Sequence, residues 1–114
     1  MSKNLRGYSQ IVHRARPKLY ATYKKAINAT STLETILGVA LPANVCMVRV
    51  MNESAAVVRF QNNAAADANA AGLAAVGATN DSAEREFWGN KTELDLLQFY
   101  TGGANNASIE VYTY

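Results

Sequence analysis

The stretch that decides the fold is VCMVRVM, residues 45–51. Its side chains alternate with a period of two, which is the pattern of a strand whose two faces meet different surroundings. We therefore predict a strand here, with Arg49 and both methionines facing outward. The expected core residues are Cys46, Val48 and Val50. This interpretation makes Cys46 a small buried hydrophobe rather than a reactive thiol.

The next segment repeats the same pattern. Asn52-Glu53-Ser54 is typical of a turn, and Ala56, Val58 and Phe60 then occupy alternate positions. Because two alternating segments joined by a short turn usually pair with each other, we predict a β-hairpin formed by residues 45–51 and 56–60.

Other strand-like segments lie on both sides of this predicted hairpin. Alternation predicts strands at residues 18–24, 84–88, 93–100 and 108–114. In the first of these, Leu19, Ala21 and Tyr23 should share one face. In the third, Leu94 and Leu96 should point inward, with a bend near Leu96 where the alternation changes phase.

Two further segments are harder to assign. Residues 31–41 contain Ser31-Thr32-Leu33-Glu34, which could be a capping box before a helix, but they also alternate like a strand. We favour the strand, because Gly38 and the β-branched residues lower the helix propensity. Residues 64–78 are rich in alanine and predict a loop or a short helix.

Short strands separated by turns predict an all-β fold, either a small antiparallel β-sandwich or a jelly-roll-like barrel of about six to seven strands. A chain of 114 residues, 49% hydrophobic and 18% charged, fits one folded domain. We divide it into an extended basic N-terminal arm, residues 1–17, and a single β domain, residues 18–114. Without a secretory signal or a long apolar run, we expect synthesis in the cytoplasm and no membrane partner.

The formal net charge of +2 conceals a strong asymmetry. Residues 1–25 hold seven basic residues and no acid, whereas the rest holds four basic residues against nine acids. Such a basic end can dock on an acidic protein surface, neutralise phosphates or solvate an arm. Tyrosines interleaved with the bases are typical of interface anchors. The predicted partner-binding residues are therefore Lys3, Arg6, Arg14, Arg16, Lys18, Tyr20, Tyr23, Lys24 and Lys25.

The residue set argues against catalysis. A single cysteine and a single histidine exclude a disulfide framework within the chain and a cysteine-based zinc site. Cys46 in the core and His13 on the arm would be too far apart to form a nucleophilic pair. The carboxylates Glu84 with Glu86 and Glu93 with Asp95 fit solvated strand faces better than a general acid-base site. We expect no enzyme activity, no metal and no cofactor.

Four segments together resemble a known class of protein. They are Leu41-Pro42-Ala43-Asn44, Val48 to Asn52, Ala55 to Phe60, and Ile109 to Tyr112. This combination resembles the small β-sandwich virion accessory proteins of tailed bacteriophages, which decorate or cement a capsid. The likeness covers roughly residues 40–114, and the basic arm and the alanine-rich residues depart from it.

The resemblance implies a non-enzymatic virion structural protein, a capsid decoration or cement subunit that binds the assembled phage head and stabilises subunit boundaries. Its partners would be the major capsid protein or other virion proteins, and it would form a homo-oligomer, for which we expect a trimer. Two alternatives stay open. One is a head-fibre base or portal/tail-junction structural protein, and the other is a nucleic-acid-binding module that acts through the basic arm.

Overall fold

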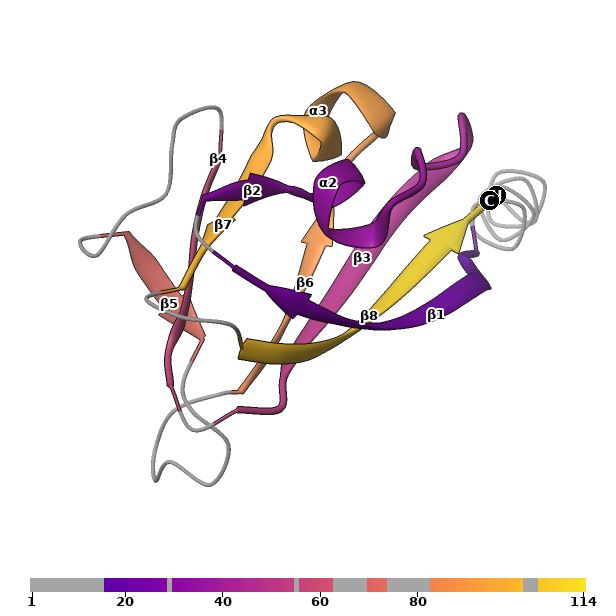
Figure 1. The fold of residues 1–114 in the computed structure, drawn as a ribbon. Helices are drawn as coiled ribbons and strands as arrows, with labels where there is room; N and C mark the ends of the chain where they lie inside the picture. The colour runs from indigo at the N-terminus through magenta and orange to yellow at the C-terminus, as the bar shows by residue number, and fades with distance from the viewer. Residues whose placement is uncertain (1–15, 29, 55, 63–69, 74–82, 102–104) are drawn as a thin grey trace, which may run out of the picture.

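The computed structural model describes residues 16–28, 30–54, 56–62, 70–73, 83–101 and 105–114. Its strands form two four-stranded antiparallel sheets (Figure 1). In order across the first sheet lie β1 (Lys18–Ile27), β8 (Asn105–Thr113), β3 (Val45–Asn52) and β6 (Glu84–Trp88). In order across the second lie β2 (Ser31–Thr32), β7 (Leu97–Tyr100), β4 (Val58–Asn62) and β5 (Ala71–Leu73). The prediction of an all-β fold is confirmed.

The strands pair in a nested order along the chain. β4 pairs with β5, β3 with β6, β2 with β7 and β1 with β8, so that each pair encloses the previous one in sequence. Two further pairings, β3 with β8 and β4 with β7, join these pairs into the two sheets. From β1 to β4 the chain therefore changes sheet at every connection.

The predicted hairpin of residues 45–51 and 56–60 is wrong, because β3 and β4 lie in different sheets. Asn52 explains where the chain leaves the first sheet. Its buried side chain donates a hydrogen bond to the Ala56 carbonyl at 2.7 Å and accepts one from the Ser54 amide at 3.0 Å. These bonds satisfy the backbone of a turn that redirects the chain across the core.

One apolar core lies between the two sheets. It includes Val48 and Val50 of β3, Ile109 of β8, and Val58 and Phe99 of the second sheet, all completely buried. The inward positions predicted for Val48 and Val50 are therefore confirmed. Cys46 is buried as predicted, but it lies at a shift of the register between β3 and β8, and Val45 takes the inward position in its place. The core thus fixes which face of each sheet is left for solvent or partners.

Residues 31–41 do not form the strand that we favoured. After the two-residue strand β2 they enter helix α2 (Leu33–Leu37), whose first turn is capped by the Thr32 side chain. Leu33, Ile36 and Leu37 are buried, which is the spacing of one helix face. Gly38 ends the helix in the left-handed region at φ 76°, a conformation that glycine adopts without a steric penalty. The predicted capping box of Ser31 and Glu34 does not form, because the cap is Thr32, whose hydroxyl oxygen accepts from the Thr35 amide.

Residues 93–100 also begin differently from the prediction. Helix α3 (Lys91–Asp95) precedes β7, and Asn90 and Glu93 form a reciprocal capping box at its start. Leu94 is buried, but Leu96 is 43% exposed rather than inward. The change of phase near Leu96 therefore marks the end of a helix and not a β-bulge.

Strand β1 contains a shift of register that the sequence did not indicate. Its register with β8 shifts between Leu19 and Ala21, so that Leu19 lies opposite Tyr112 while Ala21 lies opposite the buried Val111. Leu19 consequently does not share a face with Ala21 and Tyr23. The prediction that all three share one face is therefore wrong for Leu19. A bulged residue produces this switch, since it breaks the two-residue period.

Two predicted segments fall largely outside the described residues. Residues 1–15 make up most of the predicted arm. The described part of the alanine-rich segment contains β5, so the expectation of a loop or short helix is wrong there. None of the helices in the described residues is long and apolar enough to cross a membrane.

Candidate protein-binding surface

Strand β1, together with Arg16 just before it, carries the predicted partner-binding residues that the structure describes. The exposed ones are Arg16, Lys18, Tyr20, Lys24 and Lys25. Tyr23 is half-buried and packs against the core, so part of its ring is already used inside the domain. Lys3, Arg6 and Arg14 lie outside the described residues. Strand β1 lies at the edge of the first sheet (Figure 1). The exposed cations on it therefore belong to an edge strand.

An apolar row crosses the outer face of the first sheet. It consists of Leu19, Tyr112, Met47 and Trp88, which are cross-strand neighbours on β1, β8, β3 and β6. Leu19 is 54% exposed and Trp88 is 58% exposed at its two ends. Met47 lies on the predicted outward side but is buried, because its neighbours cover it. The exposed apolar area is therefore greatest at the two edges of the sheet.

A cluster of charges lies beside this apolar row. Arg49 on β3 reaches Glu84 on β6 with Nη2 to Oε2 at 2.7 Å, and Glu110 on β8 with Nη1 to Oε1 at 3.5 Å. The Tyr112 hydroxyl donates to the same Glu110 oxygen at 3.1 Å. Arg49 thus links three strands and neutralises part of an otherwise acidic face.

The pKa values of Arg49 and Tyr112 are both raised, so both groups hold their protons more firmly. The hydrogen bond with Glu84 is the main reason that the pKa of Arg49 is raised, and the charges of Glu84 and Glu110 add to it. Burial is the main reason that the pKa of Tyr112 is raised, followed by its hydrogen bond with Glu110. Both groups therefore act as fixed hydrogen-bond donors rather than as proton carriers.

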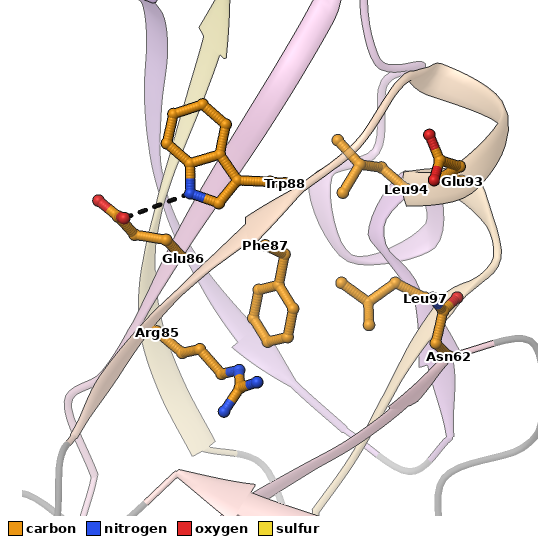
Figure 2. Close-up of a pocket in the computed structure, with 8 residues that line it drawn as sticks. All are labelled: Asn62, Arg85, Glu86, Phe87, Trp88, Glu93, Leu94 and Leu97. Carbon is orange, nitrogen blue, oxygen red and sulfur yellow. Dashed lines mark hydrogen bonds between the residues drawn. The ribbon is translucent and has the colours of Figure 1, made fainter.

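Two adjoining hollows lie where β6 forms the edge of the first sheet. The one drawn in Figure 2 has a volume of ≈ 180 Å³, and its lining includes Glu86, Trp88 and Glu93. The other has a volume of ≈ 380 Å³, and its lining includes Phe60, Asn62, Arg85, Phe87 and Leu97. The rings of Phe60 and Phe87 meet edge to face at 4.9 Å, and the Arg85 guanidinium lies 5.0 Å from the centre of the Phe60 ring. Aromatic walls beside a cation suit an aromatic or carboxylate side chain.

The carboxylates that could in principle serve in catalysis all have structural contacts. Glu84, Glu86, Glu93 and Asp95 each form a hydrogen bond or ion pair within the domain. Their partners are, in that order, Arg49, Trp88, Asn90 and Lys91. Only the first two carboxylates lie on a strand, since Glu93 and Asp95 belong to α3.

The single cysteine has a structural position as well. The Cys46 thiol is buried, donates to the Tyr112 carbonyl at 3.5 Å and has its pKa raised by burial. His13, the other half of the pair that we considered, lies outside the described residues. Within the described ranges, no group of His, Cys, Asp and Glu side chains is arranged to hold a metal ion.

Sequence reasoning missed most of this surface apart from the cations. The alternation of residues 84–88 did predict the strand β6, with Glu84 and Glu86 on a solvated face. It could not show which residues lie beside them, because cross-strand neighbours come from distant parts of the chain. The apolar row and the contacts of Arg49 appear only when β6, β3 and β8 are placed in register.

We compared the chain with models of known protein families, with curated proteins and with solved structures, and none of the three comparisons gave a match.

Proposed function

We propose that this chain is a non-enzymatic structural subunit of a virion, a capsid decoration or cement protein that docks on an acidic protein surface of the assembled shell. The observation that carries the proposal is the exposed border of β1, where Lys18, Lys24 and Lys25 accompany Leu19 and Tyr20. This strand directly continues the basic residues 1–17. An elongated basic and apolar border suits adhesion to another protein better than chemistry on a small molecule.

The nested strand order supports this assignment at the level of fold. Two sheets in the orders β1-β8-β3-β6 and β2-β7-β4-β5 have the arrangement of a jelly roll, a double-sheet fold that occurs in viral capsid and lectin domains. A fold by itself does not determine a function. The role in a virion therefore rests on the resemblance of residues 40–114 and on the surface, and the fold is compatible with both.

The energetics of such a contact favour many copies. An exposed charge pair at the rim of an interface contributes only about 0–1 kcal/mol. Leu19 and Tyr20, which are 54% and 58% exposed, offer the apolar area that a rim of lysines lacks. Repeated binding on a symmetric shell would add avidity to a modest single contact.

The test begins with particles purified by density gradient from the culture that produces the protein. We expect the chain to co-sediment with them, and to be absent after a mild salt wash that leaves the shell intact. Recombinant protein should rebind the washed particles. The triple variant Lys18→Glu, Lys24→Glu, Lys25→Glu should rebind poorly, while the matched triple replacement by arginine should rebind normally.

Two outcomes would overturn the proposal. The first is equal rebinding of the glutamate and arginine variants, because the border of β1 would then have no role. The second is tight binding to nucleic acid that falls steeply with salt, with no binding to particles. That second result would assign the chain to the nucleic-acid-binding class, since phosphate contacts release counterions.

A further inference from the structure

The first sheet has two edges that complement each other. β1 forms one edge and β6 the other, and no strand in the described part of the chain pairs with the outer side of either (Figure 1). An edge strand presents a row of backbone donors and acceptors that can pair with another chain.

The strand directions allow the two edges to pair with each other in different copies. β1 is antiparallel to β8, β8 to β3 and β3 to β6, so β1 and β6 run in opposite directions. If a second copy continues the sheet in the same orientation, its β1 lies antiparallel beside β6 of the first copy. The pairing then has the same hydrogen-bond pattern as the rest of the sheet.

The register of the sheet indicates which residues would meet on the outer face. Each cross-strand row runs from a residue of β1 to a residue of β6. The residues at the two ends of the first three rows are Leu19 and Trp88, Thr22 and Glu86, and Lys24 and Glu84. Continuing each row into the next copy brings Leu19 beside Trp88, Thr22 beside Glu86 and Lys24 beside Glu84. One pair is apolar, one is polar and one has opposite charges, and all three are favourable cross-strand combinations.

The inner face gives the same result. Here the rows end with Ala21 and Phe87 and with Tyr23 and Arg85. Continuation places the small Ala21 next to the Phe87 ring and the Tyr23 ring next to the Arg85 guanidinium. Arg85 already lies over the Phe60 ring, so a second aromatic ring would extend an existing cation-π arrangement.

We propose that copies of this chain associate head to tail, with β1 of one copy pairing antiparallel to β6 of the next in the register given above. Charge favours this contact over contacts about a two-fold axis, in which β1 would pair with β1 or β6 with β6. The described residues of β1 include three lysines and no acid, so pairing β1 with itself brings like charges together. Pairing β6 with itself about Glu86 places two carboxylates opposite each other.

The geometry of the contact limits the assembly that results. A contact between two different edges is heterologous, and it closes into a ring only if the rotation between copies divides a full turn. The twist between adjacent strands supplies a rotation in one sense. This inference does not require the proposed virion function, although it uses the same edge strand β1. Cross-linking and sedimentation without particles measure the contact between copies alone, whereas rebinding to particles measures the docking.

Disulfide cross-linking tests the register directly. Thr22 and Glu86 are exposed and would face each other across the contact. Within one chain they lie three strand spacings apart, roughly 14 Å, which is too far for a disulfide. We would prepare Thr22→Cys and Glu86→Cys separately, keep the buried Cys46 in both, and oxidise each variant alone and the two mixed.

We expect cross-linked dimers in the mixture that contain one chain of each variant, and little product from either variant alone. The double variant should form a ladder of larger species that collapses on reduction. Wild-type protein and a mixture of Thr22→Cys with Thr92→Cys, an exposed position on α3, serve as controls for Cys46 and for random collision.

Efficient cross-linking of Thr22→Cys alone would show a two-fold contact between β1 strands and would overturn the proposal. Failure of the mixture to exceed the Thr92→Cys control would overturn it as well. Sedimentation of the wild-type protein gives an independent measurement. There we expect association that Lys24→Glu weakens about fivefold and Lys24→Arg leaves unchanged. A wild-type chain that stays monomeric at the highest soluble concentration would also refute it.

Discussion

Phe99 offers the sharpest test of how the two sheets hold together. Its side chain on β7 is 0% exposed, and its ring meets Phe87 of the first sheet edge to face at 5.7 Å. Replacing a buried phenylalanine by alanine costs about 3–5 kcal/mol, because the cavity left behind collapses only partly. A domain of this size is usually stable by about 5–15 kcal/mol, so Phe99→Ala should lose a large share of that total.

We expect Phe99→Ala to lower Tm by more than about 10 °C and to shift the urea midpoint with little change in slope. Phe99→Leu keeps most of the buried volume and should cost less than about 1.5 kcal/mol. Tyr114→Ala, at a position that is 57% exposed, should change little. A loss below about 1 kcal/mol for Phe99→Ala would refute the packing of the two sheets through this ring.

Three further outcomes follow from the local contacts. Arg49→Met should lower the Tm at low salt by removing the contacts with Glu84 and Glu110, and the difference should shrink near 1 M salt, where exposed charges are screened. Asn90→Ala should cost about 1 kcal/mol in urea unfolding by removing the cap of α3. The pKa of Cys46 is raised by burial, so its contribution to the free energy of unfolding is present below the unfolded-state pKa of about 8.5 and is lost as pH rises. Stability curves at increasing pH should therefore fall less steeply for Cys46→Ala than for the wild type, and parallel curves would contradict this reasoning.

The sequence was sufficient where one segment alone determined the outcome. Alternation in residues 45–51 correctly placed Val48 and Val50 in the core, because a central strand must bury one face. The exposed cations of β1 could also be predicted, since lysine is rarely buried without a partner. Both results depend only on the period of the pattern and on the cost of burying a charge.

The sequence was misleading where two local patterns competed. Residues 33–37 fit a helix and a strand equally well by spacing, and the Thr32 cap together with Gly38 decided in favour of the helix. Residues 90–93 carried the same kind of capping signal, which the alternation of Leu94 and Leu96 obscured. In both places a hydrogen bond at the helix end outweighed a weak β propensity.

The candidate surface could not be predicted as a whole because it depends on pairing between distant strands. Nothing near residue 88 indicates that Trp88 lies in one cross-strand row with Leu19, with Met47 and Tyr112 between them. The sheet to which β4 belongs depends on the Asn52 turn and on partners in β5 and β7. Long-range register is a property of the assembled fold and leaves little trace in a single segment.

The nested order of strand pairs also constrains the time course of folding. β4 and β5 are near neighbours in sequence, whereas β1 must wait for β8, whose residues 105–113 leave the ribosome much later. Contacts that close such long loops form slowly, because chain entropy opposes them until the intervening pairs exist. During synthesis β1 therefore stays without its own partner strand longer than any other strand. Its lysines would then keep the nascent chain soluble while the edge is unprotected.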